Sequence, residues 1–181
     1  VINFRSYGEN KYKVANYGIQ YMNGLQDNGV MACAKHFPGH GDTDMDSHKD
    51  MPEINKSYAE LENLELFPFK KLIDNGLQSA MIAHLHIPAL DQQKNIPSTL
   101  SYKTVTSLLK GKMGFSGLVF TDALNMEGVA KYYEAGDIDL KAFEAGNDML
   151  LFSQDVAAGV SKIKAAILKD SVYELQLEKS V

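Results

Sequence analysis

Short apolar runs alternate along this chain with segments of helical periodicity. The apolar runs lie at residues 30–34, 79–83, 118–120 and 148–152. Between them, apolar side chains recur every three or four positions, a spacing typical of helices. Strands that are apolar throughout belong to parallel sheets whose two faces are covered by helices. The pattern therefore predicts an α/β fold with parallel strands and about four β/α units.

Turn and capping residues mark the ends of the expected helices. Asn28-Gly29 ends a helix over residues 11–27, and Ser57-Tyr58-Ala59-Glu60 is a capping box for helical sequence that runs to Asn75-Gly76. Pro68 is expected to divide this second stretch into two helices. Further helices are expected to begin at Ser101, Asp137, Asp155 and Ser171.

Polar residues collect where the apolar runs end. They are Lys35 and His36 after the first run, His84 and His86 after the second, Asp122 after the third, and Ser153 and Gln154 after the fourth. Parallel sheets bind ligands at the carboxyl ends of their strands, in doubly wound sheets and in (β/α)8 barrels alike. A complete barrel needs about 250 residues and eight strands. If the fold is a barrel, we expect its N-terminal half to be missing.

The histidines are the most concentrated chemical feature of the chain. All five lie between residues 36 and 86, and three of them fall within residues 35–48. This run mixes imidazoles and carboxylates with Gly and Pro directly after an apolar run, which indicates a loop crowded with proton-transfer groups. Within it, we expect His40 and Asp42 to shape the glycine-rich bend rather than to perform chemistry.

Composition limits the kinds of function that this chain can have. Its 181 residues are 45% hydrophobic and 23% charged, which is ordinary for one globular domain. The formal net charge of −5 provides no basic surface for nucleic acid or for anionic membranes. The only cysteine, Cys33, excludes an internal disulfide and is expected to be an inert buried thiol. No apolar run has the length of a membrane span. The chain begins abruptly at Val1, so we expect upstream sequence to have been removed, and location stays open between the bacterial cytoplasm, the periplasm and secretion.

Four motifs in order resemble those of glycoside hydrolase family 3, in particular its bacterial β-N-acetylglucosaminidase (β-hexosaminidase) branch. They are Lys35-His36-Phe37-Pro38-Gly39-His40-Gly41-Asp42-Thr43, Asp46-Ser47-His48, Ala83-His84-Leu85-His86-Ile87-Pro88-Ala89 and Phe120-Thr121-Asp122-Ala123-Leu124-Asn125-Met126. The catalytic domain of that family is a TIM-like barrel, and these motifs belong to its later part. The resemblance therefore implies that residues 1–181 are a single fragment of the family's N-terminal catalytic domain, without the early strands and their acidic sugar-binding residue.

The resemblance also implies the catalytic roles. It assigns Asp122 as the nucleophile of a retaining glycosidase, which forms a covalent glycosyl-enzyme, and His48 as the acid/base, oriented by Asp46. The residues alone leave other readings open. A carboxylate after a strand equally suits a helix cap, and an isolated Asp-x-His is most simply an exposed ion pair.

The resemblance implies that Lys35, His36 and Arg5 contact the sugar. Without the resemblance, Arg5 would be interpreted as part of a surface salt bridge. His84 and His86 are candidates to line the site, but we expect at most one of them to face the ligand. The implied substrate is a terminal β-linked N-acetylglucosamine, on a peptidoglycan fragment, and no cofactor or metal is expected.

Three alternatives stay open. His84-Leu85-His86 with nearby carboxylates could serve a metal-dependent TIM-barrel hydrolase, although no His-Glu-x-x-His pattern is present. A histidine acid/base is also compatible with a glycoside phosphorylase, because a neutral imidazole repels phosphate less than a carboxylate does. The chain could instead be an inactive fragment that self-associates, with a homodimer through the open barrel edges as one way to cover them.

Overall fold

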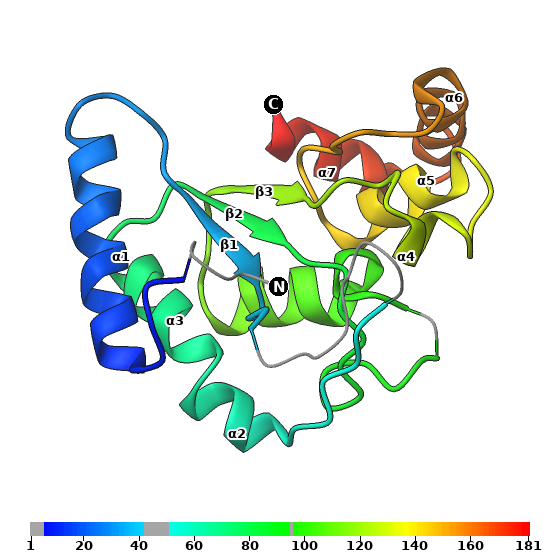
Figure 1. Cartoon of the computed structure of the whole chain (residues 1–181). Coiled ribbons are helices and arrows are strands. Elements are labelled where there is room, and N and C mark those ends of the chain that lie inside the picture. Colours follow the sequence, from blue (N-terminus) through cyan, green and yellow to red (C-terminus); the bar gives the residue numbers. More distant parts are fainter. Residues whose placement is uncertain (1–5, 42–50, 95) are drawn as a thin grey trace.

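A three-stranded parallel sheet forms the centre of the molecule (Figure 1). The structure is a computed structural model that describes residues 6–41, 51–94 and 96–181. The strands are β1 (Cys33–Phe37), β2 (Ser79–Ile82) and β3 (Leu118–Thr121), and their order in the sheet is β1-β2-β3. β1 pairs with β2, and β2 pairs with β3, both in parallel. The prediction of an α/β fold with a parallel sheet is confirmed.

β1 begins three residues later than the first apolar run. The amides of Asn28, Gly29 and Val30 donate to carbonyl groups of Leu25 and Gln26, so these residues close the preceding helix instead of extending the strand. Lys35 and His36 consequently lie within β1, and the expectation that they follow it was wrong. Cys33 was expected to be buried but is exposed, because β1 is an edge strand of the described sheet.

The fourth expected strand, at residues 148–152, is reduced to a single parallel bridge between Met149 and Phe120. The carboxylate of Asp148 accepts the amide proton of Val119 at 2.8 Å, where a regular ladder would use a backbone carbonyl. At the other end, Phe152 adopts a φ of 50°, which is incompatible with extended backbone. The segment follows β3 without forming a regular strand, so the expectation of a full fourth strand was wrong.

The helices of the first half confirm the expected boundaries. α1 (Lys11–Gln26) is capped by Asn10 and packs beside α3 (Leu66–Asp74). The capping box at Ser57 forms and begins α2 (Tyr58–Asn63). Pro68 lies in the first turn of α3, where its missing N–H is not needed, so the break precedes Pro68.

The described residues of the second half form two non-α segments and four α-helices. They are the 3-10 turn η2 (Ser98–Leu100), the π-helix η3 (Lys103–Lys112), α4 (Glu127–Ala130), α5 (Asp137–Ala145), α6 (Val156–Ile167) and α7 (Ser171–Ser180). Asp155 caps α6 as expected, through the amide of Ala158. α7 begins at Ser171, but its capping side chain is Asp170 rather than Ser171. No helix within the described ranges is both long and apolar enough to cross a membrane.

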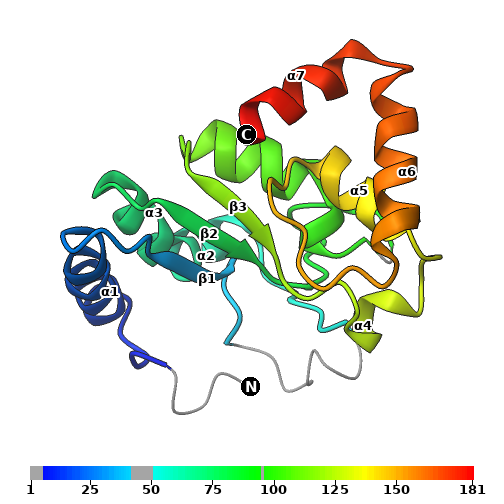
Figure 2. The same ribbon diagram turned by 90° about the horizontal axis from the view of Figure 1, so that it is seen from above.

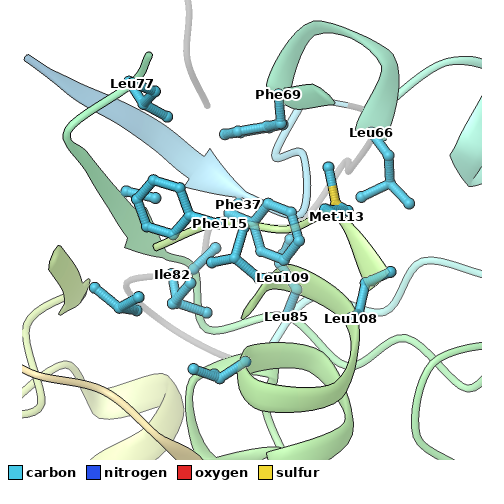
Figure 3. Close-up of a cluster of buried hydrophobic side chains, with 14 of the residues drawn as sticks. Phe37, Leu66, Phe69, Leu77, Ile82, Leu85, Leu108, Leu109, Met113 and Phe115 are labelled. Carbon is cyan, nitrogen blue, oxygen red and sulfur yellow. The ribbon is translucent and has the colours of Figure 1, made fainter. Parts of the chain in front are cut away.

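The main hydrophobic core lies between the sheet, α3 and η3 (Figure 3). Phe37 from β1 meets Phe69 from α3 edge to face, with the ring centroids 5.2 Å apart. Ile82 from β2 and Leu109 from η3 are fully buried in the same cluster. This packing fixes the three strands, and therefore the side chains at their carboxyl ends.

Candidate active site

Asp122 directly follows β3 and points its carboxylate to a partly open surface. Its amide donates to the carbonyl oxygen of Ile82 at 2.9 Å, so the backbone is still tied to β2 at this residue. One carboxylate oxygen, Oδ1, accepts the amide proton of Ala123 at 2.9 Å. The side chain is 23% exposed, which leaves it accessible to a ligand. A carboxylate held in this way has a fixed direction and a free face.

Asp122 does not cap the following helix. α4 begins at Glu127 after Met126, and no side chain caps it. The oxygen Oδ1 bonds to the residue next to Asp122 instead. The alternative reading of Asp122 as a helix cap is therefore wrong.

His36 lies beside Asp122, although the two residues are far apart in sequence. Its Nε2 is 3.9 Å from Oδ2 of Asp122, which is too long for a hydrogen bond but close enough for electrostatic attraction when the ring is protonated. The ring of His40 meets the His36 ring edge to face, with centroids 6.2 Å apart. The structure thus brings together two of the expected site residues, His36 and Asp122, and places the glycine-loop residue His40 against His36.

Lys35 occupies a different position from His36. It is exposed on β1, and within the described part of the chain it forms no hydrogen bond or ion pair with Asp122. Four expected residues lie outside the described part of the chain: Arg5, Asp42, Asp46 and His48. The acid/base pair of His48 and Asp46, the sugar contact of Arg5 and the structural role of Asp42 therefore stay predictions.

His84 points into the protein rather than into the site. It is only 1% exposed, and its ring lies between Thr99 and the loop after β3. Nε2 donates to the carbonyl oxygen of Ala123 at 3.0 Å, and Nδ1 lies 2.8 Å from the hydroxyl of Thr99. Burial lowers the pKa of His84 and favours the neutral ring, while the hydrogen bond to Ala123 and the nearby charge of Asp122 act in the opposite direction.

His86 is half-buried and lines a shallow pocket with Glu53, Pro88 and Lys94. Its backbone forms a parallel bridge with Glu53, and its Nδ1 lies 3.5 Å from the carbonyl oxygen of Ile96. Of the two histidines, only His86 therefore has access to the surface. Ser153, after the fourth apolar run, is half-buried.

Two residues that the sequence did not single out belong to this arrangement. Thr99 is fully buried and contacts His84, and Ala123 joins His84 to Asp122 through its backbone. Thr99 sits in no recognisable motif, and the role of Ala123 depends only on its main-chain atoms. Ala123 lies inside the motif around Asp122, but nothing in the sequence indicates either role, because both arise from folding.

The described residues contain no group of three or more His, Cys, Asp or Glu side chains that could hold a metal ion. Their chemistry is that of a carboxylate beside an imidazole at the carboxyl end of a parallel sheet. Such a pair can attack an electrophilic carbon and bind hydroxyl groups.

Comparisons with known proteins show which chains this one resembles. A β-hexosaminidase of Nitrosospira multiformis is 37% identical over 158 residues, which cover 87% of this chain and 44% of that protein. The structure of a glycoside hydrolase family 3 β-N-acetylglucosaminidase from a Paenibacillus species matches 99% of this chain and 35% of its own, with 38% identity and a TM-score of 0.89. Zinc-bound CbsA from Thermotoga neapolitana matches 99% of this chain and 41% of its own, with 33% identity and a TM-score of 0.90.

The chain spans less than half the length of each of these proteins. None of the matches supports a homodimer. The family model of the glycosyl hydrolase family 3 N-terminal domain, however, matches residues 1–181, the whole of the chain. The resemblance inferred from the four motifs is confirmed, and the chain belongs to glycosyl hydrolase family 3.

Proposed function

We propose that this chain carries the nucleophile of a retaining β-N-acetylhexosaminidase. The observation that carries the proposal is the placement of Asp122 at the carboxyl end of β3, with one oxygen held by the amide of Ala123 and the other 3.9 Å from His36. A retaining glycosidase needs a fixed carboxylate with one accessible face, which attacks the anomeric carbon. Asp122 meets both requirements.

In the proposed reaction, Asp122 displaces the leaving group and forms a covalent glycosyl-enzyme. His48, oriented by Asp46, protonates the departing oxygen and then takes a proton from the attacking water. Lys35, His36 and Arg5 bind the sugar hydroxyls. The imidazole of His36 lies beside Asp122 with its side chain 11% exposed, which supports this assignment for one of the three.

The proposed substrate is a terminal β-linked N-acetylglucosamine, carried by a peptidoglycan fragment. The names of the relatives support the sugar, since they are β-hexosaminidases and β-N-acetylglucosaminidases. Residues 1–181 contain no Trp, so within this chain only Tyr or Phe can stack on the sugar ring.

We further propose that the described sheet is the later part of a (β/α)8 barrel and that this chain alone has little or no activity. The three-stranded sheet with β1 at its edge supports this, as does the limited share of the relatives that the chain matches. A closed site in such a barrel needs loops from most of its strands.

The test is covalent trapping in the natural polypeptide that contains these residues. It is treated with an activated fluorosugar of the N-acetylglucosamine series, and intact mass followed by peptide mapping locates the adduct. We expect one sugar on Asp122, and none in Asp122→Asn, whose amide keeps the size of the side chain but is a poor nucleophile. An adduct on another residue, or turnover without any adduct, overturns the assignment.

The same preparation separates the other reaction classes. Loss of activity on chelation, restored by one stoichiometric metal, indicates the metal-dependent hydrolase. A sugar 1-phosphate formed only when phosphate is present indicates the phosphorylase. Free N-acetylglucosamine under both conditions, without a metal requirement, is the result that we expect.

A further inference from the structure

The backbone of Ala123 is held from two sides. Its N–H donates to Oδ1 of Asp122, and its carbonyl oxygen accepts a hydrogen bond from Nε2 of His84. These two interactions lie on the same residue, immediately after the proposed nucleophile. Any movement of the Ala123 backbone therefore changes the direction of the Asp122 carboxylate.

The contact with Ala123 fixes which ring nitrogen of His84 carries a proton. A carbonyl oxygen only accepts hydrogen bonds, so Nε2 must be protonated. In the neutral ring that burial favours, Nδ1 can then only accept a hydrogen bond, and the hydroxyl oxygen of Thr99 lies 2.8 Å away from it. The Thr99 oxygen also lies 2.7 Å from the carbonyl oxygen of Ala83, and its single proton can serve only one of these two acceptors.

Thr99 is part of a rigid support. It is fully buried in η2, and the neighbouring Ser98 hydroxyl donates to the carbonyl oxygen of Leu85 at 2.7 Å. This turn is therefore fixed to the segment directly after β2. His84 is held on one side by η2, and with its other nitrogen it holds the loop after β3.

We propose that His84 is a positioning residue that sets the direction of the Asp122 carboxylate through the carbonyl group of Ala123. The inference rests on the proposed function of Asp122 as the nucleophile. It assigns His84 a role that differs from sugar binding, since its ring is enclosed. An interaction acting through the backbone alters the alignment of attack more than it alters substrate affinity, so it acts mainly on kcat.

Three substitutions separate hydrogen bonding from packing. In His84→Gln the amide nitrogen reaches approximately the position of Nε2 and can donate to Ala123. In His84→Asn the amide is shorter and reaches only the position of Nδ1. In His84→Met the side chain keeps a similar volume and donates no proton.

The experiment measures kcat and KM for a chromogenic β-N-acetylglucosaminide in the natural polypeptide. We expect kcat to fall by about 10- to 100-fold in His84→Met and His84→Asn, with KM changed by less than about threefold. His84→Gln should restore kcat to within about threefold of the parent value. Circular dichroism and melting curves on all four proteins identify any variant that has not folded.

The outcomes keep this inference apart from the proposed function. If the parent protein shows neither turnover nor trapping at Asp122, the proposed function fails. If the parent is active and folded His84→Met keeps its kcat, the positioning role is wrong. A rise in KM alone shows that His84 contributes to binding, and equal losses in Gln and Met show that the ring is needed for its shape; both results also overturn the inference.

Discussion

His84 makes folding stability depend on pH, because its titratable ring is enclosed within the protein. Burial lowers the pKa of His84 in the folded state, whereas the unfolded chain has the ordinary value of about 6.5. Below that value the unfolded chain binds more protons than the folded chain. The stabilising contribution of the neutral ring is therefore complete above about pH 6.5 and is lost as the pH falls towards the folded pKa.

The prediction compares the parent with His84→Gln in urea denaturation at pH 7.5 and 5.0. Between these values, we expect the parent to lose more unfolding free energy than the variant, by up to about 1.4 kcal/mol for each pH unit below 6.5. Other titrating groups, including Asp91 and Glu60 with their lowered pKa values, are common to both proteins and cancel in the comparison. Parallel pH profiles would show that folding does not lower the pKa of His84.

The sequence correctly predicted the position of a site residue where a functional residue type lies at the end of a strand. Asp122 and His36 were both expected at the carboxyl end of the sheet, and the structure places them beside each other. His84 was expected to be a candidate for lining the site, but it is enclosed. Its direction depends on the packing of η2, a segment without any sequence pattern that would have indicated it.

At the level of elements, the close approach of β2 and β3 depends on a residue without a side chain. Gly117 directly precedes β3, and a Cβ atom there would lie 2.2 Å from the carbonyl oxygen of Gln78. That oxygen accepts the amide proton of Leu118, which is the first hydrogen bond between the two strands. The obstacle is backbone, so it cannot rotate away.

We predict that Gly117→Ala lowers the free energy of unfolding by at least about 2 kcal/mol, because the strands must separate to admit the methyl group. Gly24→Ala is the matched control. Gly24 lies within α1 with no heavy atom within 4 Å of the added Cβ, so this change should stabilise the protein by about 0.5–1 kcal/mol. Chemical denaturation of both variants measures the difference. Equal effects would mean that the strands can move apart at little cost.

Helix boundaries were easier to predict than strand boundaries. Capping is local chemistry, and the Ser57 capping box and the Asp155 cap both form where the sequence placed them. A strand instead begins and ends where a partner strand stops pairing. The apolar run at 148–152 has the composition of a strand, yet the Asp148 carboxylate replaces a backbone partner of β3 and limits the pairing to one bridge. Periodicity contains no information about such a side chain.

At the scale of the whole molecule, the sheet is covered unevenly. The core of Figure 3 fills the side towards α3 and η3, while β1 borders the described sheet without a further strand beside it (Figure 2). Cys33 and Lys35 are exposed on this strand, and Val30 and Met31 before it are 53% and 46% exposed. An edge strand with neighbouring apolar surface is a place for another segment to pair. In the proposed barrel, the residues preceding α1 in the natural polypeptide provide that segment.

Cys33 offers a direct measurement of whether the edge is covered. Its neighbours desolvate the thiol enough to raise its pKa, even though the side chain as a whole is exposed, so labelling is best followed at about pH 8.5. We predict that a thiol reagent modifies Cys33 readily in this chain, although more slowly than in the urea-unfolded chain, because the raised pKa leaves less thiolate. In the natural polypeptide with its preceding residues, labelling should be much slower, because a strand or helix packed against β1 excludes the reagent. Residues 1–181 contain one cysteine, so all labelling of this chain reports on Cys33. In the natural polypeptide, peptide mapping separates the labelling of Cys33 from that of any cysteine in the preceding residues. Equal labelling rates in the two folded proteins would show that the β1 edge stays open, and the proposal of a completed barrel would then be wrong.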